Sequence, residues 1–80
     1  MPIALYNYTA IFTPAEEGFI VAVPLVLGCV SVGNSFEQAR DNIREAIELY
    51  FETLLSEGQN PPIERLHPLA STIDVHVTGA

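Results

Sequence analysis

The sequence predicts an α+β domain in which three strands precede one long helix and a fourth strand follows it. Three observations lead to this order. Residues 35–57 carry apolar side chains with the period of a helix, whereas the stretches before them have the composition and patterning of strands. Residues 72–78 alternate between apolar and polar side chains again.

The helix is expected over residues 35–57, SFEQARDNIREAIELYFETLLSE, and the rest of the chain is organised around it. Apolar residues recur there at spacings of three and four and so share one face: Phe36, Ala39, Ile43, Ala46, Ile47, Tyr50, Phe51, Leu54 and Leu55. Ser35 is a favourable N-cap, and Gln38 completes a capping box with it. Gly58 and the two prolines beyond it predict where the helix ends.

The strands are expected over residues 3–12, 19–23, 29–32 and 72–78. They are separated by a turn at residues 14–18, a loop at residues 24–28, the helix and an irregular connection over residues 58–71. Short links between the first three strands predict an antiparallel meander, and a helical crossover predicts that the fourth strand returns parallel. The expected result is a four-stranded mixed sheet of order 3-2-1-4 with the helix on one face.

One helix covers only one face of such a sheet. The other face would carry a set such as Tyr6, Tyr8, Phe12 and Ile20, or its alternate. Because an exposed patch of this kind is unusual on a monomer, we expect a homodimer or higher homo-oligomer.

The composition indicates a single domain over residues 1–80 with a strongly acidic balance. The formal net charge is −7, and the chain has no lysine. Direct nucleic-acid binding is not expected, because it depends on basic residues that neutralise phosphates. An acidic surface suits a basic protein partner, although solubility alone explains it as well.

The compartment is expected to be the cytoplasm. Cys29 is the only cysteine, so no intrachain disulfide can form, and neither a basic leader nor a membrane-length apolar run is present.

No enzyme mechanism is expected, and no cofactor or metal site. Asp74 and His76 share one face of the last expected strand and would be close enough for acid–base chemistry. Nothing in the sequence ties a nucleophile to them, so solvated positions opposite a buried face explain them better. Neither His67 nor His76 has metal-ligand spacing with Cys29.

The middle of the chain carries an ordered set of residues that resembles the signature of HicB-type antitoxins. The set is Pro24, Gly28-Cys29-Val30, Gly33, Ser35, Glu37 and Ala39, preceded by Tyr8–Phe12 with Glu16-Glu17-Gly18 and followed by Ala46, Leu49-Tyr50 and Leu54-Leu55. The resemblance covers about residues 5 to 58. It implies a β-β-β-α-β, partial RNase H-like fold without nuclease activity. It also implies a partner: a small basic HicA-type toxin, an mRNA nuclease whose RNA-binding surface the antitoxin covers.

Two departures from the family pattern stand out. Leu25 and Leu27 occupy loop positions where an acidic residue and a proline are common, so the loop is unusually apolar. Many relatives also carry a C-terminal DNA-binding domain, whereas only two residues follow the last expected strand. Operator binding by this chain alone is therefore not expected.

The resemblance and the charge together indicate an antitoxin that occludes a basic toxin, with a stand-alone oligomeric interaction module as the alternative. The candidate partner-binding residues are Glu45, Glu48 and Glu52 on the outer helix face and Leu25, Val26 and Leu27 in the loop.

Overall fold

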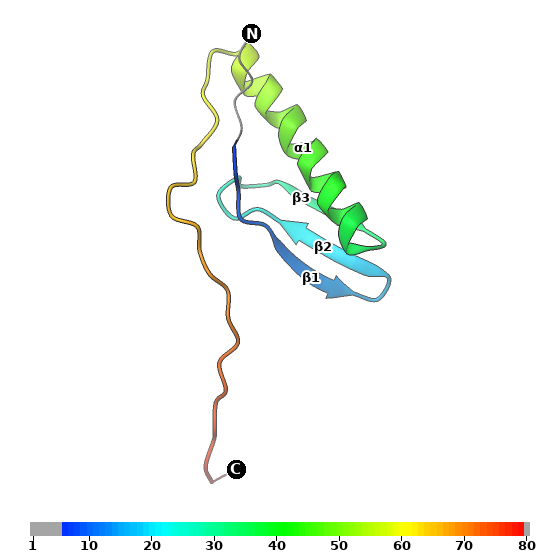
Figure 1. The fold of residues 1–80 in the computed structure, drawn as a ribbon, viewed down its shortest axis with the longest axis vertical. Coiled ribbons are helices and arrows are strands. Elements are labelled where there is room, and N and C mark those ends of the chain that lie inside the picture. Colours follow the sequence, from blue (N-terminus) through cyan, green and yellow to red (C-terminus); the bar gives the residue numbers. More distant parts are fainter. Residues whose placement is uncertain (1–5, 80) are drawn as a thin grey trace.

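The computed structural model describes residues 6–79 and has an α+β architecture with three strands and one helix (Figure 1). The strands are β1 (Ile11–Ala15), β2 (Gly18–Ala22) and β3 (Val30–Gly33), and the helix is α1 (Phe36–Ser56). They form an antiparallel sheet of order β1-β2-β3. The predicted fold class, meander and long helix are therefore confirmed.

The helix begins and ends where the sequence predicts. The Ser35 hydroxyl accepts a hydrogen bond from the Gln38 backbone N–H at 3.1 Å, and the Gln38 side chain accepts one from the Asn34 backbone N–H. At the other end, Gly58 has a φ of +77°, and the N–H groups of Gly58 and Gln59 donate to the carbonyls of Leu55 and Leu54. This Schellman arrangement satisfies carbonyls that the last helical turn leaves free.

The first strand lies later in the chain than predicted. Residues 3–5 of the expected strand lie outside the described residues, and residues 6–10 precede β1 without strand pairing. Ala15 pairs with Gly18 around a two-residue turn, so the strand continues through Pro14. Because β2 offers only five partners, Gly18–Ala22, pairing stops at Ile11.

The sheet has one covered face and one bare face. Val21, which is fully buried, lies with Phe12 and Ser31 on the face that α1 covers. The core joins that face to the buried stripe of the helix; its buried members are Val21, Val23, Val26, Ala39, Ile43, Ile47 and Phe51. Helix α1 packs chiefly over β3 and β2, which leaves β1 at the open side.

The expected fourth strand and the order 3-2-1-4 are not found among residues 6–79. Residues 59–79 form an extended tail, defined here as the segment after α1, and the tail has no strand pairing. It first runs back along the residues before β1 and then leaves the body (Figure 1). The extended alternation is present, but no neighbouring strand pairs with it.

Candidate functional site

The acidic outer face of α1 lies opposite its buried stripe. Glu45, Glu48 and Glu52 are all exposed; Glu45 lies nearly opposite the buried Ile43 and Ile47, whereas Glu48 and Glu52 also border the groove beside them. The only ion pair found on the described part of the helix joins Arg44 and Asp41 at 3.2 Å, and both side chains are more than half exposed. The three carboxylates therefore face solvent in the single chain.

The loop between β2 and β3 is fixed from within. Val26 is 3% exposed and belongs to the core, its N–H donates to the Val23 carbonyl at 3.0 Å, and its carbonyl accepts from the Cys29 N–H at 3.1 Å. Leu25 is 40% exposed and Leu27 is 91% exposed. Of the three apolar loop residues predicted to bind a partner, two reach the surface, and Val26 holds the loop in place.

The bare sheet face is an apolar surface. Two cross-strand rows build it, and its exposed large residues are Ile11, Ile20, Val30 and Val32, which are 45–61% exposed. Ile20 was predicted to lie on the uncovered face, whereas Tyr8 and Phe12, named with it, pack against the core. The bare face therefore combines Ile20 of β2 with the alternate set of β1, which includes Ile11 instead of Phe12.

A groove of about 980 Å³ separates the β1 side of the sheet from α1. Ala10 and Phe12 line it from the sheet side, and Ile43 and Ile47 line it from the helix. Charged residues of α1 also line it: Arg40, Arg44, Glu48 and Glu52. The groove is therefore apolar within and carries charges of both signs along the helix.

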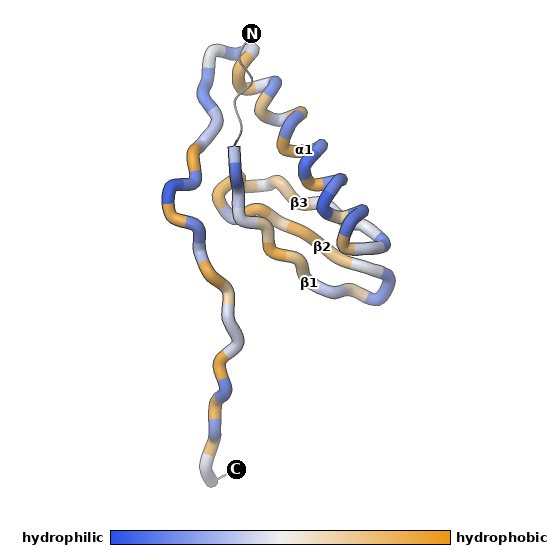
Figure 2. The backbone as a smooth tube through the Cα atoms, viewed as in Figure 1, coloured by the Kyte–Doolittle hydropathy of each residue, from blue (hydrophilic) through white to orange (hydrophobic). Residues whose placement is uncertain are grey.

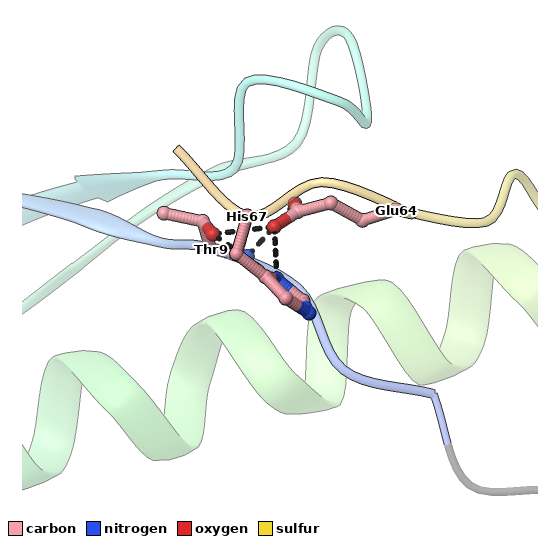
Figure 3. Close-up of polar contacts among 3 residues, drawn as sticks. All are labelled: Thr9, Glu64 and His67. Atoms are coloured by element: carbon pink, nitrogen blue, oxygen red, sulfur yellow. Dashed lines mark hydrogen bonds and ion pairs between the residues drawn. The ribbon is translucent and has the colours of Figure 1, made fainter. Parts of the chain in front are cut away.

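A polar clamp holds the first part of the tail against the residues before β1 (Figure 3). The Thr9 backbone N–H donates to Glu64 Oε1 at 2.9 Å, the Thr9 hydroxyl donates to the other carboxylate oxygen, and His67 Nδ1 contacts that same oxygen. The Tyr8 hydroxyl donates to the Pro62 carbonyl. The clamp is defined here as Tyr8, Thr9, Pro62, Glu64 and His67.

The pKa values of Glu64 and Tyr8, two members of the clamp, are shifted by their surroundings. The Thr9 hydroxyl, then the Thr9 backbone N–H, and to a smaller extent His67 hold the pKa of Glu64 below its usual range. Desolvation by burial, with smaller contributions from Tyr6 and Glu64, raises the pKa of Tyr8. At neutral pH the carboxylate is therefore the acceptor and the phenol is the donor.

The clamp is not arranged as a catalytic relay. In a nucleophile–histidine–acid relay the imidazole uses its two different nitrogens to contact the two partners. Here Thr9 Oγ1, at 3.5 Å, and Glu64 both lie beside His67 Nδ1. The hydroxyl and the carboxylate thus contact the same ring nitrogen, and the hydroxyl also donates directly to the carboxylate.

The other residues considered for chemistry are not brought together. Asp74 and His76 are both exposed in the tail, which has no strand pairing there. Burial raises the pKa of the Cys29 thiol, so the thiol is less readily deprotonated to a reactive thiolate. Within residues 6–79, no group of three or more side chains is placed to hold a metal ion.

No helix in that range has the length and apolar character needed to cross a membrane.

Sequence reasoning missed the clamp, because Thr9 and Glu64 are 55 residues apart and neither belongs to a recognisable motif. Glu64 and His67, three residues apart in a proline-rich connection, were the only local signal. The fold and these surfaces define a small α+β domain with an open sheet edge, an acidic helix face and an anchored apolar tail.

Comparison with known proteins gives the family. Residues 8–77 match the family described as "HicB_like antitoxin of bacterial toxin-antitoxin system". Since the match spans most of the chain, the chain belongs to the HicB-like antitoxin family, as the sequence resemblance predicted. The match includes the clamp and nearly all of the tail.

The chain is also similar to curated proteins named UPF0150. The chain is 44% identical to a UPF0150 protein of Synechocystis sp. over 66 residues, which are 81% of this chain and 84% of the relative. It is 37% identical to a UPF0150 protein of Thermoplasma acidophilum over 71 residues, which are 88% of this chain and 97% of that protein. No solved structure matches significantly.

Proposed function

We propose that this chain is an antitoxin that binds a small basic mRNA-cleaving toxin and neutralises it by covering the toxin's RNA-binding surface. Membership of the family supports the antitoxin class. The observation that carries the mechanism is the outer face of α1, where Glu45, Glu48 and Glu52 are exposed on one side of a rigid helix. A surface that binds RNA must be rich in Lys and Arg, so carboxylates on a rigid face complement it.

The loop supplies the apolar part of the proposed interface. Leu27 projects from a loop that the buried Val26 anchors, and Leu25 lies exposed beside it. A fixed loop loses little conformational freedom on binding, which favours its use as a contact. The encounter is proposed to take place in the cytoplasm, where an mRNA-cleaving toxin would find its substrate.

Charge reversal tests the acidic face. The variant Glu45→Lys, Glu48→Lys, Glu52→Lys is expected to weaken binding to a small basic HicA-type toxin by roughly tenfold to a hundredfold at low salt, since three attractions become repulsions. The dependence of binding on salt is expected to flatten at the same time. Titration calorimetry at two ionic strengths measures both effects.

A matched control separates local contact from net charge. The variant Glu16→Lys, Glu17→Lys, Glu57→Lys makes the same change in net charge at exposed positions in the β1–β2 turn and at the end of α1. It is expected to retain most of the affinity. Equal weakening by both variants would mean that overall charge alone acts, and no weakening by either would remove the helix face from the interface.

The alternative is a stand-alone oligomeric interaction module with the same fold and no toxin. The bare sheet face favours it, because Val30 and Val32 remain more than half exposed and suit a second apolar surface. Co-expression decides between the two. A small basic protein encoded beside this chain whose growth arrest the chain rescues supports the antitoxin, whereas the absence of such a protein, or a chain that neither rescues nor binds it, supports the module.

Self-association is part of both proposals. The chain exposes apolar side chains on the bare sheet face, in the loop and along the tail, and a homodimer or higher homo-oligomer would bury part of them. Light scattering at micromolar concentration tests this, because a mass of 8.7 kDa would correspond to a monomer.

A further inference from the structure

The outer part of the tail is a strand without a neighbour. Ile73, Val75 and Val77 alternate with polar residues and are 80%, 77% and 78% exposed. Figure 2 shows this alternation of hydrophobic and hydrophilic residues along a segment that stands away from the body. A period of two with one apolar side is the pattern of a half-buried strand. Within residues 6–79, however, no apolar surface covers these side chains.

The first part of the tail, residues 59–67, is called its root here, and it is held against the residues before β1 of the same chain. The clamp joins Pro62 and Glu64 to Tyr8 and Thr9, immediately before β1. Beyond the clamp, the chain leaves the helix and sheet rather than following β1 (Figure 1). The residues after the clamp, 68–79, can reach at most about 40 Å when fully extended. That length is enough to reach a neighbouring molecule.

A complementary surface exists on the β1 side of the body. β1 has β2 on one side and no partner strand on its outer edge among residues 6–79. The groove between β1 and α1 opens beside this edge and is lined by Phe12, Ile43 and Ile47. A strand added at this edge would place every second side chain over the groove.

The opposite edge of the sheet is less suitable. Helix α1 packs over β3, and the Asn42 side chain donates to the Val32 carbonyl at 2.8 Å. One carbonyl of β3 is therefore already occupied by the helix. Within residues 6–79, an open strand edge lies beside the apolar groove at β1 and not at β3.

We propose that residues 72–78 of one copy pair with the outer edge of β1 in a second copy, where Ile73, Val75 and Val77 fill the groove between β1 and α1. The exchange is reciprocal, so two copies related by a two-fold axis complete each other's sheets. It supplies the fourth strand from the partner, while the clamp keeps each tail root on its own body. This inference specifies the self-association and does not depend on toxin binding.

Isotope-filtered NMR on the full chain tests which molecule supplies the strand. Labelled and unlabelled chains are mixed in equal amounts, unfolded and refolded together. The expected result is a particle of 17.4 kDa, twice the chain mass, with nuclear Overhauser contacts from Ile73 and Val75 to Phe12 and Ile43 between labelled and unlabelled molecules. Contacts found only within one molecule would place the strand on its own β1 edge and overturn the exchange. A particle of either mass without these contacts would overturn the docking site as well.

A pair of variants tests the side of the strand that is buried. Ile73→Ser, Val75→Ser, Val77→Ser is expected to raise the dimer dissociation constant by about a thousandfold or more, because six apolar side chains per dimer lose their burial. The matched control Asp74→Ser, His76→Ser, Thr78→Ser changes the other side of the same segment. It is expected to shift the dimer dissociation constant by less than about tenfold. Equal shifts in the two variants would contradict the assigned orientation. Neither variant involves the toxin, so its result stands whether or not the antitoxin proposal holds.

Discussion

The body of the molecule, residues 11–56, and the tail, residues 59–79, carry similar apolar patterns but are packed very differently. Val21 in β2 is fully buried, whereas Val75 in the tail is 77% exposed. β2 finds its neighbours through a two-residue turn on one side and a short loop on the other. The tail has no such neighbour in sequence. Alternation therefore determines which side chains share a face, and the connections determine which strand they meet.

The largest expected difference comes from truncating one apolar side chain in each region. Phe51 is 8% exposed and its ring meets that of Tyr8 at 5.5 Å between centroids, so Phe51→Ala is expected to lower the free energy of unfolding by about 3–5 kcal/mol. Leu69 is 93% exposed, and Leu69→Ala is expected to change the free energy of unfolding by less than about 0.5 kcal/mol. Urea unfolding followed by helical circular dichroism measures both. Similar losses would show that the tail is packed as firmly as the body.

A smaller difference is expected from adding one methyl group in each region. A Cβ on Gly33 would lie 2.3 Å from the Ala39 backbone nitrogen, so Gly33→Ala must separate β3 from the first turn of α1, at a cost of about 1–3 kcal/mol. Gly79 has nothing within 4 Å of the corresponding position. Although its φ is +81°, the free end of the tail can change conformation, so Gly79→Ala is expected to have an effect below about 0.5 kcal/mol. Thermal unfolding of both variants gives the comparison, and an unchanged midpoint for Gly33→Ala would contradict the close approach.

The smallest expected effect is local and lies where the two regions meet. The pKa of Glu64 is lowered in the folded chain, so its contribution to the clamp is complete above its ordinary pKa of about 4.5 and is lost as pH falls through the lowered value. The Thr9 amide resonance is expected to report this loss, together with faster hydrogen exchange at that amide. In Glu64→Gln the same acid step should be absent. A step of unchanged midpoint in that variant would assign the titration to another group.

The helix and the order of the first elements could be predicted because their signals are local. Ser35, Gln38 and Gly58 act within a few residues of the helix ends, and the structure places them as predicted. The first strand was predicted too early, since the turn was assigned to residues 14–18. The strand includes Pro14 and Ala15, and a proline is tolerated there because β1 is an edge strand.

The fourth strand and the clamp could not be settled from the sequence for a different reason. Both depend on pairs of residues far apart in the chain, such as Thr9 with Glu64. The pattern of Ile73, Val75 and Val77 predicts an apolar side but contains no information about the molecule that covers it. Likewise, apolar character alone did not distinguish Val26, which is core, from Leu27, which is surface.

Pro14 has a consequence for how far assembly can proceed. An exposed strand edge is a template on which further strands can stack, and proteins limit such growth with prolines and charges. Pro14 offers no backbone donor, and Glu16 and Glu17 place two negative charges at the adjoining turn. The outer edge of β1 can therefore pair with a strand from another molecule over only part of its length. In the proposed exchange, this geometry would favour closed, finite particles over fibres, even though the chain combines an open edge with an apolar tail.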